Sequence, residues 1–326
     1  TPLLALIQKL FPQKDIQEEY RRQQAQGVFK ALIALGNPEN GRALLSVAKS
    51  TLDGAKNLLS VTALHMTPGT DTNPIYGEDY ARESFKGILA ESEKLRFDIA
   101  TEHKFADNIE QGVVRTVNSE NFDFLLVGAG VSLSGISFIK THSYWERFDI
   151  LSQLVNKVTR SREIFYPGSL IKDKTKYFVE HSKCSVGIFI NRNFQNIRDV
   201  LVLIQHENDD FLVRYAHRLL KNDAGIQLTL IDEQKLLQST DAFKRSYTEL
   251  VKHYPNSVKL QRSSRSSYSY FGKYSLMLVS YTVWNQLTHS NSSMLENIPS
   301  TLIINKKPSR FSDTSFHLKP DADPDI

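Results

Sequence analysis

The sequence predicts an α/β fold made of two tandem domains, each built on a parallel β-sheet. Short apolar runs alternate with helical stretches from Val28 onward, a pattern typical of strands joined by helical crossovers. The same order of elements restarts at Asp199, and the two halves align closely, with Ala31 opposite Val200 and Val61 opposite Leu228. A repeat this long indicates two similar domains and not a solenoid.

The first half is predicted to alternate strands and helices as far as Ile190. The apolar run FDFLLV is continuous, as expected for a strand that is buried on both faces of a parallel sheet. Apolar residues at helical spacing, such as Leu44 and Ala48, indicate the helices. The predicted strands are 28–35, 57–65, 98–105, 122–127 and 185–190, and the predicted helices are 41–53, 78–97, 109–117 and 173–181.

The second half is predicted to repeat this order after a linker at 191–198. We expect the two halves to pack as a pseudo-dimer, joined through their fifth strands or the faces beside them. The predicted strands are 199–204, 226–231, 257–261, 274–280 and 301–304, and the predicted helices are 211–220 and most of 233–253.

Composition narrows the class of protein. Forty Lys and Arg residues against 36 Asp and Glu residues leave a net charge of +4, without a block of like charge that would serve as a nucleic-acid-binding arm. No run reaches the roughly 18–20 apolar residues of a membrane span, which excludes a complete channel or transporter but not a soluble piece of one. The single cysteine, Cys184, excludes a disulfide framework and favours a reducing, cytosolic setting.

The N-terminal segment has two interpretations. Residues 3–11 are mostly apolar, and charged residues that include Arg21 and Arg22 follow them. This order is the reverse of a signal peptide, and the apolar part is too short to span a bilayer. The segment is either an amphipathic surface helix or the end of a transmembrane helix that leaves the membrane on its cytoplasmic side, as the positive-inside rule favours.

Several motifs resemble those of a known family. ALIALGNPENGRALL, which contains Asn40, resembles the strand–turn–helix opening of universal stress protein domains, and FDFLLVGAG resembles their fourth strand and phosphate loop. PGSLIKDKTKYFVEHSKCSVGIFINR resembles their closing segment, and DVLVLI, IQLTLID and YSLMLVSYT extend the likeness to the second half. The resemblance implies two tandem universal-stress-protein-like (adenine nucleotide alpha hydrolase-like) parallel-sheet domains. They are expected at 27–192, with an insertion at about 136–167, and at 198–306, followed by a disordered tail at 307–326.

A narrower resemblance concerns the N-terminus. Thr1-Pro2-Leu3 is similar to the end of the last transmembrane helix in monovalent cation/proton antiporters of the cation:proton antiporter-2 family, some of which carry a cytosolic tail of two universal-stress-like domains. The resemblance implies that residues 1–26 are a membrane-exit segment and linker. It also implies a regulatory tail on the cytoplasmic face of the inner (plasma) membrane. Its partners would be the transmembrane Na+ or K+/proton antiporter domain of the same polypeptide and a second copy in a homodimer, with no nucleic acid.

A free-standing tandem universal stress protein that binds ATP or AMP is the alternative. Members of the family that bind nucleotides have a glycine motif after strand four, because glycines let backbone N–H groups approach phosphate oxygens and a helix N-terminus adds its dipole. Here Val131 stands where the second glycine is expected. For a divergent first-half site, the resemblance implies ATP or AMP held by backbone amides, with Arg160 or Arg162 within reach. The candidate binding residues are Gly36, Asn37, Gly128, Gly130, Gly168 and Ser169.

A second interpretation is that these glycines only shape the turns between strands and helices. In the second half, Gln205 and Ser280 stand at the positions of Gly36 and Gly128, and no glycine loop follows, so no nucleotide site is expected there.

No pattern predicts catalysis or a metal centre, so we expect a protein that is not an enzyme, with no catalytic residue and no metal ligand. The nine histidines have no metal-binding spacing, and none of them stands out as a pH sensor. The acidic cluster that begins at His206-Glu207 is expected to cap a helix, since acidic residues favour the helix dipole there. Cys184 precedes an apolar strand and is expected to be a packed small side chain.

Overall fold

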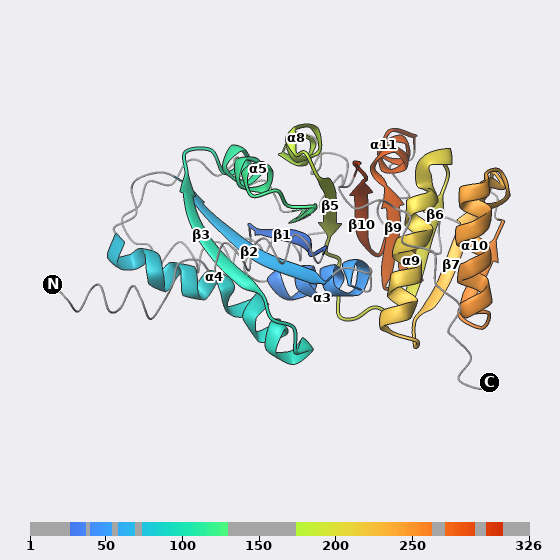
Figure 1. The fold of residues 1–326 in the computed structure, drawn as a ribbon, viewed down its shortest axis with the longest axis horizontal. Coiled ribbons are helices and arrows are strands. Elements are labelled where there is room, and N and C mark those ends of the chain that lie inside the picture. Colours follow the sequence, from blue (N-terminus) through green and yellow to red (C-terminus); the bar gives the residue numbers. More distant parts are fainter. Residues whose placement is uncertain are drawn as a thin grey trace.

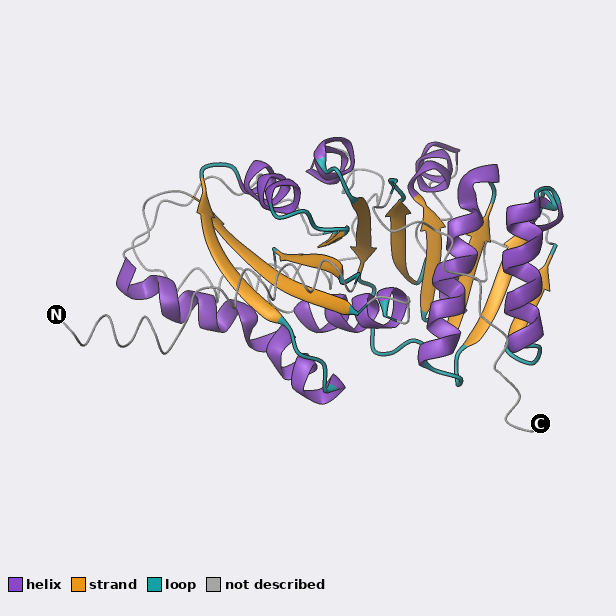
Figure 2. Cartoon of the chain, in the orientation of Figure 1, coloured by secondary structure: helices purple, strands orange, loops and turns teal. Residues whose placement is uncertain are grey.

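The ten strands that the computed structural model describes form one twisted sheet with helices on both faces (Figure 1 and Figure 2). The strand order is β3-β2-β1-β4-β5-β10-β9-β6-β7-β8. The predicted α/β fold class, with a mostly parallel sheet in each half, is therefore confirmed. The structure describes residues 27–36, 40–53, 58–68, 74–129, 174–262, 271–290 and 298–308. No helix within these ranges is both long and apolar enough to cross a membrane.

The first half places β1 and β4 at the centre of five parallel strands. The run FLLVG is buried over its first four residues, as its continuous apolar character predicts. The elements of this half are β1 (Phe29–Leu35), α3 (Gly41–Leu52), β2 (Leu59–Pro68), α4 (Pro74–Leu95), β3 (Ala100–Ala106), α5 (Ile109–Ser119), β4 (Phe124–Gly128), α8 (Lys174–His181) and β5 (Ser185–Ile190).

The second half repeats this arrangement. Its elements are β6 (Asp199–Ile204), a 3-10 turn η3 (Glu207–Asp209), α9 (Asp210–Asn222), β7 (Gln227–Asp232), a 3-10 turn η4 (Leu236–Gln238), α10 (Asp241–His253), β8 (Val258–Gln261), β9 (Leu276–Ser280), α11 (Tyr281–Ser290) and β10 (Ser300–Asn305).

The registers of the two halves confirm the predicted repeat. Ala31 pairs with Val61 in β1 and β2, and the residues aligned with them, Val200 and Leu228, pair in β6 and β7. Ala31 also pairs with Phe124 of β4, as Val200 pairs with Leu276 of β9. The paired residues of these strands therefore have defined counterparts in the other half.

The joint is formed by the fifth strands, as the first of the two predicted arrangements requires. β5 and β10 pair antiparallel from Thr301 opposite Ile190 to Asn305 opposite Val186, whereas the other strand pairs of the sheet are parallel. The linker at 191–198 runs as irregular structure from β5 to β6. If the halves were separate, β5 and β10 would each be an edge strand. Their pairing gives hydrogen-bond partners to N–H and C=O groups that would otherwise be unpaired.

Each face of the sheet has its own hydrophobic core. One core contains residues of α3, α4, α9 and α10, such as Leu45, Ile88, Leu212 and Phe243, and it extends across both halves. The opposite core contains residues of α5, α8 and α11, such as Val113 and Trp284. The two layers of helices are visible on either side of the sheet in Figure 1. Burial on both faces explains why most strands are continuous apolar runs.

Two features of the second half were missed in the sequence. Helix α11 was not predicted, although Val283, Trp284 and Leu287 stand at helical spacing and are buried. The helix predicted over most of 233–253 is divided, because Lys235 adopts a left-handed φ of 59° before η4, and α10 begins only at Asp241. A left-handed residue cannot continue an α-helix, so the chain restarts with a new N-cap at Thr240.

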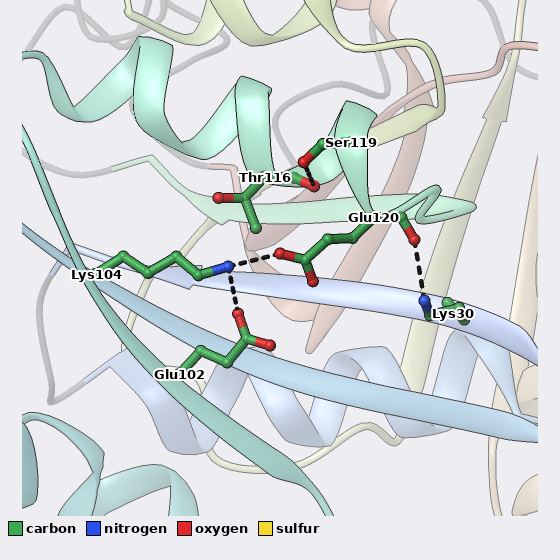
Figure 3. Close-up of polar contacts among 6 residues, drawn as sticks. All are labelled: Lys30, Glu102, Lys104, Thr116, Ser119 and Glu120. Atoms are coloured by element: carbon green, nitrogen blue, oxygen red, sulfur yellow. Dashed lines mark hydrogen bonds and ion pairs between the residues drawn. The ribbon is translucent and has the colours of Figure 1, made fainter. Parts of the chain in front are cut away.

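The outer strand β3 carries a charged cluster on one face (Figure 3). Lys104 Nζ lies 2.8 Å from Glu102 Oε2 and 2.6 Å from Glu120 Oε1, and Lys30 Nζ donates to the Glu120 carbonyl at 3.0 Å. Burial lowers the pKa of Lys104, but hydrogen bonds and charge from Glu102 and Glu120 outweigh burial, so the pKa rises overall. Charges on an edge strand oppose pairing with another chain, which gives this cluster a structural role.

Candidate functional site

The candidate site lies at the carboxyl edge of the first-half sheet, between β1 and β4. From β1 the strand order runs one way to β2 and β3 and the other way to β4 and β5, so β1 and β4 flank the switch point. In open parallel sheets, ligands bind outside the carboxyl ends of the strands at this point. Gly36 follows β1 directly and Gly128 ends β4, and Ala34 pairs with Val127 between them. The structure therefore brings these two candidates together.

Neither glycine is explained by backbone conformation. A turn that demands glycine has a left-handed φ. Among the described residues, the only glycine with positive φ is Gly27, so Gly36 and Gly128 do not need that freedom. A Cβ added to Gly36 would meet no atom of the described chain within 4 Å, and one added to Gly128 would lie 3.8 Å from Asn40 Nδ2. Among the described residues, the place of a side chain is therefore unoccupied at Gly36, whereas at Gly128 it would be in ordinary contact with α3.

The other candidates fall outside the described ranges. These are Asn37, Gly130, Gly168 and Ser169, together with Arg160 and Arg162 and the whole insertion at 136–167.

Asn40 belongs to this edge, although it was not among the predicted binding residues. It is the N-cap of α3, yet its side chain makes no capping hydrogen bond to this helix, all of which is described. Instead Asn40 Oδ1 accepts from Asn191 Nδ2 at 3.0 Å, and Asn191 Oδ1 accepts from the Phe194 N–H at 2.9 Å. The linker after β5 therefore holds the residue at the start of α3. The alignment of Asn40 with Asp209 of the second half is the sequence signal that could have identified Asn40 as part of this edge.

The corresponding edge of the second half is filled by Asp209. This side chain is 1% exposed, and its Oδ2 accepts from the N–H groups of Gln205 at 3.0 Å and His206 at 2.9 Å. Burial raises the pKa of Asp209, and a hydrogen bond from Ser280 and those two backbone bonds oppose the rise. Asp209 and His206 form a capping box around η3, which confirms that the acidic cluster is a cap. Within the described residues, no group of acidic, histidine or cysteine side chains could hold a metal ion.

Two histidines lie beside the first-half edge. His65 of β2 is 4% exposed, and its Nδ1 lies 3.1 Å from the Leu35 carbonyl. His103 Nε2 lies 2.7 Å from Thr67 Oγ1, and the two imidazole centroids are 5.7 Å apart. Burial lowers the pKa of His65 to about 4; the bond to Leu35 opposes the shift and His103 adds to it. A carbonyl only accepts, so the neutral His65 ring donates through Nδ1.

These features define a class of protein: a tandem α/β protein with two equivalent edges, one bordered by the Asn40 amide and the other closed by the Asp209 carboxylate. No protein-family model matches the chain. No curated protein matches it either.

Solved structures that resemble the chain include universal stress proteins. One from Archaeoglobus fulgidus is 12% identical, with 86% of this chain and 97% of that chain covered and a TM-score of 0.49. A putative one from Pseudomonas aeruginosa is 10% identical, with 86% and 94% covered and a TM-score of 0.41. A protein of the family from Arabidopsis thaliana, with AMP bound, is 13% identical, with 51% and 93% covered and a TM-score of 0.28. The fold class of this chain rests on its own strand order.

Proposed function

We propose that the first half binds an adenine nucleotide, AMP or ATP, at the carboxyl edge formed by Gly36, Asn40 and Gly128. The chain acts through binding and performs no catalysis. The observation that carries this proposal is the contrast between the two edges. No described atom lies within 4 Å of the place of a Cβ at Gly36, whereas the equivalent second-half edge holds the Asp209 carboxylate. A ligand with phosphate oxygens suits strand ends and a helix N-terminus, where backbone N–H groups carry partial positive charge.

The proposal extends to regulation of transport. The binding module is the cytoplasmic regulatory part of a monovalent cation (Na+ or K+)/proton antiporter, at the inner face of the plasma membrane, and works as a homodimer. The sequence motif Thr1-Pro2-Leu3, the apolar-then-charged order of residues 1–26 and the tandem pair of halves support it. Residues 1–26 lie outside the described ranges, so this part rests on resemblance. A free-standing tandem universal stress protein is the second candidate.

Binding is tested by titrating AMP and ATP into the purified chain and into two leucine variants. Gly36→Leu adds a side chain whose Cβ would meet no described atom within 4 Å, and we expect it to block the ligand. Gln205→Leu changes the equivalent position of the closed half and is the matched control. We expect calorimetric binding in the wild type and in Gln205→Leu and none in Gly36→Leu. Equal binding by both variants would remove the first-half edge as the site.

The setting is tested separately by fractionating native cells and blotting for the chain. The antiporter proposal expects a membrane-bound band far heavier than this 37.2 kDa chain. A soluble band near the mass of the chain would contradict it and favour the free-standing protein.

A further inference from the structure

One pair of equivalent residues, Asn40 and Asp209, lies at the carboxyl edge of the sheet in each half and differs in charge. Asn40 stands four residues after Gly36 at the start of α3, and Asp209 stands four residues after Gln205 at the start of α9. The strand registers make these positions equivalent, since Ala31 and Val200 occupy the same place in their sheets. The same position of the repeat therefore carries an amide in the first half and a carboxylate in the second.

In the second half an anionic oxygen occupies the edge. Asp209 Oδ2 lies 3.0 Å from Gln205 N and 2.9 Å from His206 N, and the Ser280 hydroxyl also bonds the carboxylate. Two backbone N–H groups and a hydroxyl therefore surround one buried carboxylate, as they would in an anion-binding site. Here the bound anion is the side chain of Asp209. Charge-assisted hydrogen bonds of this kind are shorter and stronger than neutral ones.

In the first half the same position is neutral, and its side-chain oxygen is bonded to the linker. Asn40 Oδ1 accepts from Asn191 Nδ2, so the Asn40 amide is engaged by the linker. Gly128 replaces Ser280, so the neighbouring hydroxyl is also missing, and Gly36 replaces Gln205 where no described atom would meet a Cβ within 4 Å. Two of these changes, at Asn40 and Gly128, remove the carboxylate and the hydroxyl that lie at the second-half edge.

We propose that the residue at this position determines which half accepts an anionic ligand: Asp209 closes the second-half edge with its own carboxylate, and Asn40 puts no charge at the first-half edge. For the first half this rests on the proposed function, since the ligand there is the nucleotide phosphate. The physical reason is that a carboxylate at the strand end takes the backbone donors and repels a second anion.

The first arm compares Asn40→Asp with Asn40→Ala by AMP titration. Asn40→Asp adds a carboxylate that can still accept from Asn191 Nδ2, whereas Asn40→Ala removes this acceptor and adds no charge. We expect Asn40→Asp to bind AMP at least about tenfold more weakly than Asn40→Ala. If AMP binds the wild type and not Gly36→Leu, but both Asn40 variants bind equally, the inference is overturned and the proposed function stands.

The second arm uses Asp209→Ala and inorganic phosphate, which requires no nucleotide site. The variant should unfold at a lower temperature than the wild type, and phosphate should restore part of the loss by taking the vacated place. Sodium chloride at matched ionic strength is the control. If Asp209→Ala does not fold, Asp209→Ser replaces it, because the shorter side chain carries no charge and leaves part of the carboxylate's place to phosphate.

The two arms separate the two proposals. If the wild type binds neither AMP nor ATP, the proposed function fails and the second arm decides the inference. Stabilisation of the Asp209 variant by phosphate, with none in the wild type, would support it. Equal responses of the variant and the wild type to phosphate would overturn it.

Discussion

The side chain of Asn222, at the end of α9, hydrogen-bonds Ser50 at the end of α3 in the other half. Asn222 Nδ2 lies 3.0 Å from the Ser50 carbonyl, 3.0 Å from the Asp53 carbonyl and 3.5 Å from the Lys49 carbonyl. The last carbonyls of a helix lack partners within the helix, so this amide satisfies them from outside. The halves are therefore joined at a helix end as well as through β5 and β10.

Replacing Asn222 should weaken this second connection. We expect Asn222→Ala to lower the free energy of unfolding by about 1 kcal/mol, the usual net value of a lost hydrogen bond at a partly exposed site. Asn222→Asp should cost more, because a carboxylate cannot donate and would face the carbonyl oxygens. Urea unfolding followed by circular dichroism measures both. An Asn222→Ala variant as stable as the wild type would show that the contact contributes nothing.

Gly187 of β5 should tolerate no side chain. A Cβ there would lie 2.8 Å from Phe124 Cε1 and Cζ and 3.1 Å from Leu126 Cδ1, all in the core beside the joint. Overpacking of this kind costs about 1–3 kcal/mol, so Gly187→Ala should destabilise the protein by this amount in urea. Gly128→Ala is the control, since its nearest contact, at 3.8 Å, is ordinary. Equal stability of the two variants would contradict the packing at β5.

His65 should make the protein less stable in mild acid. The pKa of His65 is lowered to about 4 in the folded chain from an ordinary value of 6.5. Above pH 6.5 both states are neutral, and as the pH falls towards 4 only the unfolded state takes up the proton. Stability is therefore lost across this window, approaching about 3 kcal/mol at its lower end.

The variant His65→Asn checks this, because its amide can donate to the Leu35 carbonyl and does not titrate. Urea unfolding at pH 7.0 and 5.0 should show a smaller loss in His65→Asn than in the wild type. His217→Asn should reduce the loss independently, since burial and the neighbouring His253, Lys221 and Arg218 lower the pKa of His217 to about 4. An unchanged pH dependence in His65→Asn would show that His65 takes up its proton while the protein is folded.

Cys184 should be unreactive in the native protein. It is 5% exposed, and burial raises the pKa of its thiol to about 12. Thiolate is the nucleophile, and on the order of one thiol in ten thousand would be ionised at pH 8. Ellman's reagent should therefore react slowly with the folded chain and rapidly in urea. Rapid reaction under native conditions would contradict the burial of this side chain.

Much of the architecture could be predicted from sequence because it depends on local patterns. The runs at 185–190 and 199–204 are strands with the predicted bounds, since apolar stretches buried on both faces have sharp ends. The alignment of Val61 with Leu228 holds in the strand registers for the same reason. Helix α11 was missed because its buried residues, such as Trp284, follow β9 without a turn that would mark a new element.

The sequence by itself determined the repeat, the strands and the difference between the halves at Gly36 and Gly128, because each is a matter of which residue stands at which place in a local pattern. Only the tertiary structure decided that β5 pairs antiparallel with β10, that Asn191 holds Asn40, and that the Asp209 carboxylate fills its own edge. These contacts depend on how residues distant in the chain are packed together. Hydrophobic periodicity depends only on residues close together in the chain, so it does not predict these long-range contacts.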